Sequence, residues 1–213
     1  MSARESLMAL GRREVEAGLR SIPAETAADV YALSFFISAA DDDPRQASIA
    51  VGFNTEANAA GRREDEAEEA RWNYAMWLHD VVCEFPDRDG VGGDEWRALL
   101  VELSIDYTDA EAGAAFDAGE DLERSVRVTR LMLDVAVELS LHCHDSGLIR
   151  SVFGRTVPVI VRELEYYHAI ATVTEAANPP GVAFEFLSWM APCLDGADRT
   201  YEYPDLPEGK LYL

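Results

Sequence analysis

The chain has few basic side chains and almost no lysine. Its 213 residues contain 18 lysines and arginines against 40 aspartates and glutamates, so the formal net charge is −22, and Lys210 is the single lysine. A nucleic-acid-binding surface needs a basic face, a P-loop needs Gly-Lys-Ser/Thr, and Schiff-base chemistry needs a lysine in a desolvated pocket. The sequence argues against all three, and we expect no nucleic-acid partner.

Long apolar runs and paired cysteine motifs are also missing. No segment approaches the roughly 20 apolar residues that cross a bilayer, and the N-terminal residues lack the apolar stretch of a signal peptide. Cys83, Cys143 and Cys193 are widely spaced without a Cys-x-x-Cys pair, which argues against a disulfide framework and a zinc ribbon. We therefore expect a cytoplasmic protein with reduced thiols and no membrane contact.

Catalytic signatures are missing as well. The sequence contains neither Gly-x-Ser-x-Gly nor His-Glu-x-x-His. The run Gly90-Val91-Gly92-Gly93 follows a polar stretch within an acidic region, so it predicts a flexible loop rather than a phosphate cradle. We expect no cofactor and, more generally, no enzyme.

The remaining composition is that of a folded protein. Hydrophobic residues make up 48% of the chain and charged residues 27%, which is enough apolar material for a sizeable core. No Pro/Gly/Ser-rich linker separates two apolar halves. We predict one domain spanning residues 1–213, with an N-terminal helix and an acidic C-terminal tail.

The first half of the chain mixes helical and alternating patterns. Ser6–Leu19 has helical spacing, whereas Asp29–Ser38 and Ala47–Asn54 alternate with the period of a strand. The two alternating runs predict an antiparallel hairpin whose tip, Asp41–Arg45, is solvated. From Glu56 the pattern predicts a helix: the run from Glu64 to Arg71 is charged and rich in alanine, and Trp72, Met76, His79 and Cys83 then recur every three or four residues.

The second half is mainly helical. Helices are predicted to start at Asp94 and to cover Leu122–His144 and Val182–Met190, while Leu148–Phe153 is interpreted as a short strand. Pro158 is expected to open a helix that runs to Ala177. These elements predict an α+β fold in which a small antiparallel sheet of two to four strands packs against several helices.

Acidic side chains are concentrated in one stretch. Between Asp87 and Asp121 there are eleven acidic residues and two arginines, a local net charge of −9. A second acidic group consists of Glu64, Asp65, Glu66, Glu68 and Glu69. An anionic face accelerates the capture of a cationic partner, so these residues predict a surface for a basic protein.

Aromatic residues beside arginine and glutamate suggest a second candidate surface. Tyrosine, tryptophan and arginine are enriched in binding hot spots, although most such residues belong to cores. If exposed, they form a partner-binding patch of seven residues: Arg71, Trp72, Tyr74, Glu163, Glu165, Tyr166 and Tyr167.

A metal centre is the alternative chemistry. Glu165 and His168 have the Glu-x-x-His spacing of di-iron carboxylate bundles, and Glu138 and His142 lie one helical turn apart. A complete di-metal site needs a second Glu-x-x-His unit, which the chain lacks. His142 and His144 are two residues apart and cannot share one ion on a helix.

Several short segments together suggest a family. They are Asp42-Asp43-Pro44-Arg45, Gly52-Phe53-Asn54-Thr55-Glu56, the run from Glu69 to Trp77, and Glu163-Leu164-Glu165-Tyr166-Tyr167. Between Ala28 and Trp189 the chain resembles an uncharacterised bacterial domain family of unknown function. That family is similar to small acidic immunity proteins of toxin systems, and the resemblance implies no catalytic residue.

Three functions are compatible with these features. The first is a non-enzymatic, acidic, cytoplasmic binding protein, specifically an immunity protein that neutralises a basic toxin. The second is a small metal-dependent hydrolase that uses Glu138, His142, Glu165 and His168. The third is a homodimer of unknown role in which the negative charge serves only solubility.

Overall fold

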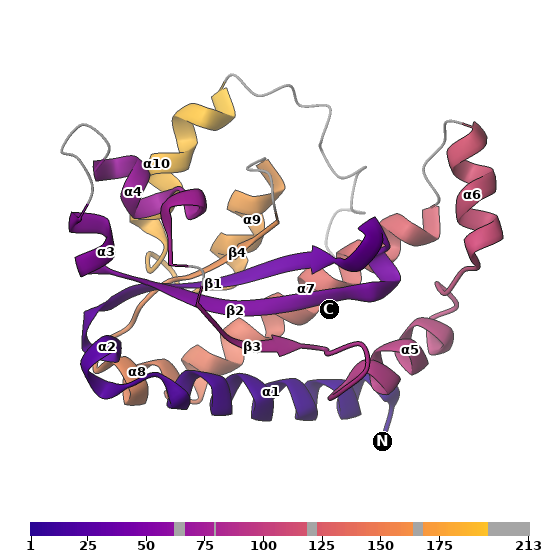
Figure 1. Cartoon of the computed structure of the whole chain (residues 1–213), viewed down its shortest axis with the longest axis horizontal. Coiled ribbons are helices and arrows are strands. Elements are labelled where there is room, and N and C mark those ends of the chain that lie inside the picture. Colours follow the sequence, from indigo (N-terminus) through magenta and orange to yellow (C-terminus); the bar gives the residue numbers. More distant parts are fainter. Residues whose placement is uncertain (62–66, 79, 119–122, 164–167, 196–213) are drawn as a thin grey trace.

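The computed structural model describes residues 1–61, 67–78, 80–118, 123–163 and 168–195 (Figure 1). Its longer helices are α1 (Ala3–Ser21), α5 (Gly93–Glu102), α6 (Asp109–Ala118), α7 (Glu123–Asp145), α9 (His168–Ala176) and α10 (Phe184–Asp195). Its shorter helices are α2 (Ala24–Asp29), α3 (Glu56–Ala60), α4 (Ala67–Trp72), α8 (Leu148–Phe153) and the single turns η1 (Ala40–Asp42), η2 (Pro44–Gln46) and η4 (Tyr74–Met76). Its strands are β1 (Val30–Ala39), β2 (Ala47–Thr55), β3 (Val81–Phe85) and β4 (Val159–Arg162).

The four strands form one sheet in the order β3-β2-β1-β4. β1 and β2 pair antiparallel from Val30 opposite Thr55 to Ala39 opposite Ala47, which confirms the predicted hairpin. β3 pairs antiparallel with β2, but β4 lies parallel to β1. The α+β class is confirmed, whereas the sheet is mixed rather than wholly antiparallel, because a long helical crossover brings β4 back beside β1.

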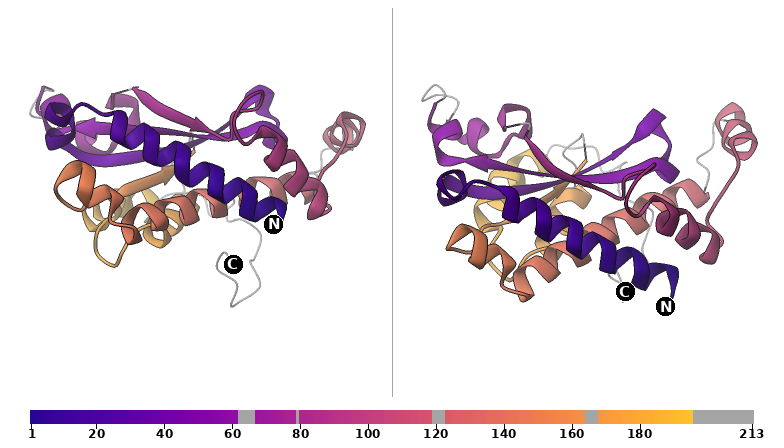
Figure 2. Two further views of the ribbon diagram at one scale, coloured as in Figure 1. Left: turned by 90° about the horizontal axis from the view of Figure 1, so that it is seen from below. Right: turned by 60° about the horizontal axis from the view of Figure 1, so that its bottom comes forward.

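Helices α1 and α7 cover one face of the sheet, as the two turned views show (Figure 2). Alternate residues of β1, namely Leu33, Phe35 and Ile37, point into this larger core. The predicted helices at Ser6–Leu19 and Leu122–His144 are confirmed as α1 and α7, and each presents an apolar stripe to the strands. In the described part of the chain, no helix is long and apolar enough to cross a membrane.

A smaller core lies on the other face of the sheet, beneath α4, the start of α9 and α10. It contains Tyr31, Trp72, Trp77, Phe186 and Met190. The rings of Tyr31 and Trp72 meet edge to face with centroids 5.5 Å apart. Trp72, the one tryptophan of the predicted aromatic patch, is therefore part of the interior.

Two predictions after α7 are wrong. Leu148–Phe153 is the short helix α8, bounded by Gly147 at φ 74° and Gly154 at φ 69°, and it is not a strand. Val159–Arg162 is a buried strand, and the following helix begins only at His168 rather than at Pro158. A short apolar run does not distinguish a buried parallel strand from a buried helical turn. Here, residues 159–162 form a strand because they pair with β1.

The helix predicted to run through Cys83 is also interrupted. α4 ends at Trp72, and Val81–Phe85 forms the edge strand β3. Cys83 lies opposite Val51 of β2. The two valines before it are β-branched, and pairing with β2 overrides the helical spacing of the more distant residues.

Candidate functional site: an acidic protein-binding surface

Negative charge is gathered at one end of the molecule. We define the acidic end as the hairpin tip, residues 40–46, together with residues 84–118, which include the loop after β3, α5 and α6 (Figure 1). It contains 13 acidic side chains and three arginines, a net charge of −10. By contrast, residues 123–163 contain five acidic side chains and six arginines, a net charge of +1. The anionic groups are therefore not spread evenly over the chain.

The hairpin tip presents two carboxylates directly to solvent. Asp41 and Asp42 are exposed, and both have φ of 56° in the left-handed region. Aspartate is among the few non-glycine residues that enter this region readily, because its short polar side chain bonds locally. The tight turn thus places two adjacent acids at the outermost point of β1 and β2.

The third tip aspartate, Asp43, is bound inside a network and is not solvated as predicted. Arg45 donates from Nε to Oδ1 at 2.9 Å and from Nη2 to Oδ2 at 2.8 Å, and the Tyr107 hydroxyl lies 3.2 Å from Oδ1. Burial raises the pKa of Asp43, but hydrogen bonds from Arg45 and Gln46 outweigh it and lower the pKa to about 2.

Arg45 connects the tip to the segment that leads into α6. Its Nη1 donates to the Tyr107 carbonyl at 2.5 Å and its Nη2 to Asp109 at 2.5 Å, while the guanidinium lies 4.5 Å from the Tyr107 ring centroid. Hydrogen bonding to Asp43 raises the pKa of Arg45 further above its ordinary value. A planar guanidinium suits this role because it serves several acceptors and stacks on an aromatic face.

Among the described residues, the side-chain hydrogen bonds that join helix α6 to the rest of the protein lie at its N-terminal end. Thr108 and Glu111 form a capping box in which the Thr108 amide donates to Glu111 at 2.7 Å and the Glu111 amide donates to the Thr108 hydroxyl at 3.3 Å. Arg124 also pairs with Glu111 and donates to the Asp106 carbonyl at 2.7 Å. The hydrogen bonds that the Glu111 carboxylate accepts, first from the Thr108 backbone and then from Arg124, lower its pKa to about 2.

The arginines of the acidic end are already engaged. Arg88 donates to Gln46 at 2.5 Å, and Arg97 donates to Asp94 at 2.6 Å and to the Arg88 carbonyl at 3.1 Å. Several exposed carboxylates remain without an ion pair to any residue that the structure describes. They are Asp41, Asp42, Asp89 and Asp117.

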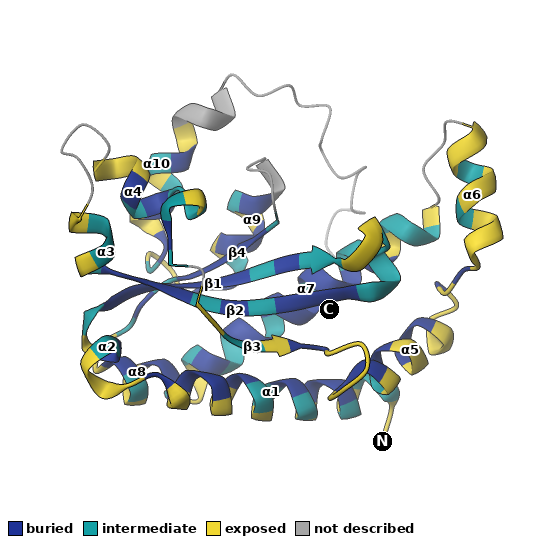
Figure 3. Cartoon of the chain, viewed as in Figure 1, coloured by how far each residue is buried: buried dark blue, intermediate teal, exposed yellow. Residues whose placement is uncertain are grey.

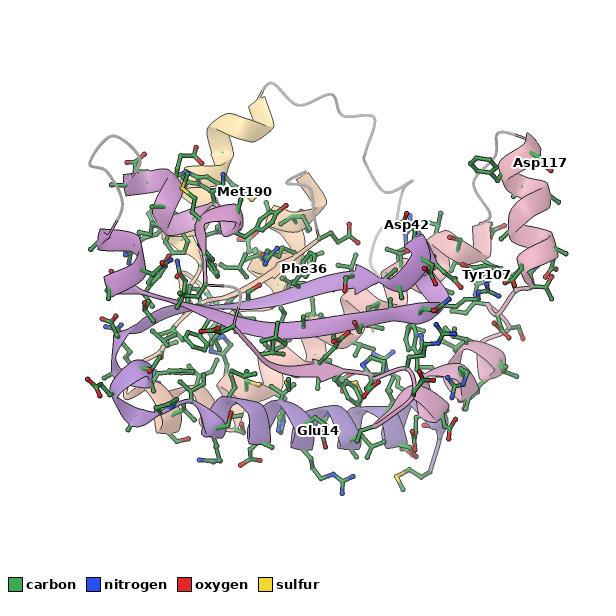
Figure 4. All side chains as sticks on the ribbon, in the orientation of Figure 1. Glu14, Phe36, Asp42, Tyr107, Asp117 and Met190 are labelled. Carbon is green, nitrogen blue, oxygen red and sulfur yellow. The ribbon has the colours of Figure 1, made fainter. Side chains whose placement is uncertain are left out.

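Two open hollows flank the tip. One, of about 810 Å³, lies between the end of the hairpin, the loop after β3 and α5, and Ser48 donates to Glu84 at 2.5 Å on its wall. The other, of about 600 Å³, lies between the tip and α6. Asp42 and Tyr107 line this second hollow. Both can be located in Figure 4, which also labels Asp117 on α6.

The predicted aromatic patch is divided between core and surface. Trp72 is only 6% exposed and packs in the smaller core, so it is not available to a partner. Arg71 is partly exposed, pairs with Glu56 at 2.7 Å and stacks 4.2 Å from the Tyr31 ring centroid. Hydrogen bonding to Glu56 raises the pKa of Arg71.

The other patch residues add little to a surface of this kind. Tyr74 and Glu163 are half-buried, and Tyr74 stacks with the Phe36 ring at 6.5 Å between centroids and with the Arg162 guanidinium at 4.0 Å. Glu165, Tyr166 and Tyr167 lie outside the described residues. The contacts of Arg71 and Tyr74 are those of residues that hold α4 to the sheet.

The second predicted acidic group is only partly visible. Glu64, Asp65 and Glu66 lie outside the described residues, whereas Glu68 and Glu69 are exposed on α4. α4 lies at the opposite end of the sheet from α6 (Figure 1). These glutamates therefore do not extend the acidic end.

The metal alternative gains no support from the described residues. Glu138 accepts from Arg4 at 3.1 Å and from Arg12 at 2.9 Å, so both of its oxygens are engaged. His142 is half-buried one turn further along α7, and Glu165 and the side chain of His168 are not described. Among the described residues, no three histidine, cysteine, aspartate or glutamate side chains gather as a metal ion requires.

The pair His142 and His144 lies in the last turn of α7, as the sequence predicts. His144 is within 3.1 Å of the side-chain oxygen of Asn178. Burial lowers the pKa of His144, and the bond to Asn178 opposes that effect. This histidine is thus part of the packing between α7 and the loop after α9.

Sequence reasoning missed the network around Arg45. Asp43 and Tyr107 are 64 residues apart, and no periodic pattern links them. The Asp43-Pro44-Arg45 turn was a usable signal, because an aspartate before proline followed by arginine favours a bonded turn over a free acidic loop.

Comparison of the chain with protein-family models, curated proteins and solved structures found no match.

Proposed function

We propose that this protein is a non-enzymatic binding protein whose acidic end captures a basic protein partner. The observation that carries the proposal is the concentration of charge: the acidic end has a net charge of −10, whereas residues 123–163 have +1. A field of one sign on one end steers a cationic partner and orients it before contact. The carboxylates on the tip and α6 that have no ion pair to a described residue can then form new ion pairs with the partner.

The geometry supports binding better than chemistry. The half-buried Asp43 is paired with Arg45 within the protein, and the exposed acidic groups have no histidine beside them in the described part of the site. Recognition of a cation needs only accessible carboxylates on a rigid support, which the hairpin provides.

Within this class, we propose an immunity protein that acts in the cytoplasm and masks a basic toxin. An inhibitor of this kind needs no catalytic residues and benefits from fast, electrostatically steered association. The partner should then be harmful when expressed alone and harmless when co-expressed with this chain.

The test is capture of partners from the native host with matched charge variants. The acidic-end variant replaces Asp41, Asp42, Asp89 and Asp117 with asparagine, and the control variant replaces four exposed or half-buried glutamates elsewhere with glutamine: Glu14, Glu25, Glu68 and Glu175. Both variants lose four negative charges, so they differ only in position.

We expect the wild type and the control to retain a strongly basic protein at about 50 mM NaCl and to release it at about 500 mM, because salt screens exposed charges. The acidic-end variant should retain much less of that protein. Capture of an acidic partner, or equal retention by the two variants, would contradict the proposal.

A further inference from the structure

Helix α6 is set apart from the body of the molecule. Both turned views show it projecting beyond the sheet and α5 (Figure 2), and none of its residues is buried (Figure 3). Helices in proteins owe most of their stability to the packing of an apolar face. Of the ten described residues of α6, Ala112 alone is a hydrophobic residue packed against the larger core, and it is only partly buried.

One aromatic side chain on this helix is almost fully uncovered. Phe116 is 84% exposed, and among the large hydrophobic residues that the structure describes only Met1, at 94%, is more exposed. A phenylalanine held in water on a projecting helix leaves a large apolar area that a partner can cover.

Phe116 borders the hollow between α6 and the hairpin tip, which we name the α6 groove. The groove has a volume of about 600 Å³, and Ala112, Ala115 and Phe116 supply its α6 wall. Pro44 and Tyr107 also line the groove, although Tyr107 is only 6% exposed. The α6 wall is therefore suited to an apolar side chain.

The rim of the α6 groove is acidic. Asp41, Asp42 and Asp109 line it. Among the described residues that line the groove, Arg45 is the only cation, and its charge is engaged by Asp43 and Asp109. An occupant with positive charge on either side of an apolar residue thus matches both the rim and the wall.

We propose that the α6 groove binds a basic segment of the protein partner, with an apolar side chain packed on Phe116 and flanking lysines or arginines paired with Asp41 and Asp42. This inference rests on the proposed function and specifies where and how the partner docks. A buried aromatic contact surrounded by charge pairs is the usual composition of a binding hot spot.

Charge argues against two other occupants. A second copy of this chain would bring an equally acidic end to the same rim. Residues 196–213 of the chain contain four acidic and two basic side chains, so they also carry the sign of the rim. Like charges in contact disfavour both.

The test uses two labelled peptides of equal charge. The apolar probe is fluorescein-labelled Lys-Arg-Leu-Phe-Arg-Lys, and the polar probe is Lys-Arg-Ser-Gly-Arg-Lys. Anisotropy at about 50 mM NaCl measures their affinities for the full chain. Phe116→Ser removes the proposed contact, and Phe184→Ser is the matched control, because Phe184 is 69% exposed on the distant helix α10.

We expect the wild type to bind the apolar probe about tenfold more tightly than the polar probe, and Phe116→Ser to abolish that difference. Phe184→Ser should bind like the wild type. Circular dichroism should be the same for both variants, since each replaces an exposed side chain.

Other outcomes separate this inference from the proposed function. If Phe116→Ser binds like the wild type while the four-aspartate variant binds neither probe, the groove is not the docking site and the acidic capture surface stands. If neither change alters binding, or neither probe binds, both proposals fail. A dimer of the wild type that Phe116→Ser dissociates in sedimentation experiments would assign the groove to a second copy and overturn the inference.

Discussion

Replacing Arg45 tests whether the bonded turn, rather than the hairpin pairing alone, holds the acidic end together. Arg45→Met keeps much of the aliphatic stem but removes the guanidinium that serves Asp43, Asp109 and the Tyr107 carbonyl. The side chains of Arg45 and Asp43 are 22% and 15% exposed, so water replaces these bonds only in part.

The expected loss in the free energy of unfolding is about 3 kcal/mol. Each charge-assisted hydrogen bond contributes on the order of 1 kcal/mol net, and the substitution also leaves the half-buried Asp43 carboxylate without its cation. Arg45→Lys should lose about half as much, because a lysine keeps the charge but cannot serve all three acceptors.

Urea denaturation followed by tryptophan fluorescence measures the effect. Trp96 is a suitable reporter because its Nε1 donates to the Arg45 carbonyl at 2.9 Å. Arg20→Met is the control, since Arg20 pairs with Glu16 at 2.8 Å while both side chains are about half exposed. That exposed pair should contribute no more than about 0.5 kcal/mol.

The cost of Arg45→Met should also depend on pH. The native pKa of Asp43 is about 2, below the ordinary value of 3.8, so its stabilisation is present above that value and is lost as the pH falls toward 2. The difference between wild type and Arg45→Met should therefore shrink between about pH 5 and pH 2. A cost equal to that of Arg20→Met at neutral pH, or a cost that does not shrink toward pH 2, would refute the reasoning.

Three further perturbations address buried or strained positions. Burial raises the pKa of Asp134 to about 7, so ionisation of this carboxyl opposes folding above that pH. Asp134→Asn should therefore raise the free energy of unfolding by about 1 to 2 kcal/mol at pH 8 and by progressively less toward pH 4, as measured by denaturation. Burial also raises the pKa of Cys83 and Cys143 to about 12, so few of these thiols are ionised in the native protein. In a Cys193→Ser background, which leaves only these two thiols, they should react with a disulfide reagent about a hundredfold more slowly in the native than in the unfolded protein. Gly92→Ala should destabilise by about 2 to 4 kcal/mol in thermal or urea unfolding, because Gly92 has φ of 88° and an added Cβ would lie 2.5 Å from the buried phenylalanine that ends β3.

Each of these has a control and a contrary outcome. Asp145→Asn, at the exposed end of α7, should leave the pH dependence unchanged, and an equal gain from Asp134→Asn at pH 4 and pH 8 would contradict the raised pKa. Gly147→Ala shares the positive φ, at 74°, but has open space around the new Cβ, so it should cost about 1 kcal/mol. Equal costs at the two glycines would show that the ring contact is unimportant, and rapid thiol reaction in the native state would show that burial does not protect the cysteines.

Part of the candidate site could be predicted from the sequence. The run of acids between Asp87 and Asp121 indicated an anionic surface, and α5 and α6 indeed carry most of its described residues at one end. The predicted aromatic patch is not one exposed surface, because Trp72 packs beneath α10 rather than facing solvent. Burial of a single tryptophan depends on elements more than 100 residues away along the chain, and composition carries no information about them.

Local periodicity and composition were enough to determine the α+β class, the hairpin of β1 and β2, the long helix α7 and the excess of negative charge. These features depend on residues that are neighbours in the chain, so their pattern is written in consecutive positions. Tertiary structure decided that 81–85 and 159–162 are strands, that Asp43 is held by Arg45 and Tyr107, and that Phe116 is left uncovered on a projecting helix. Strand pairing, ion pairing and exposure are fixed by contacts between distant segments, and only the folded chain brings those segments together.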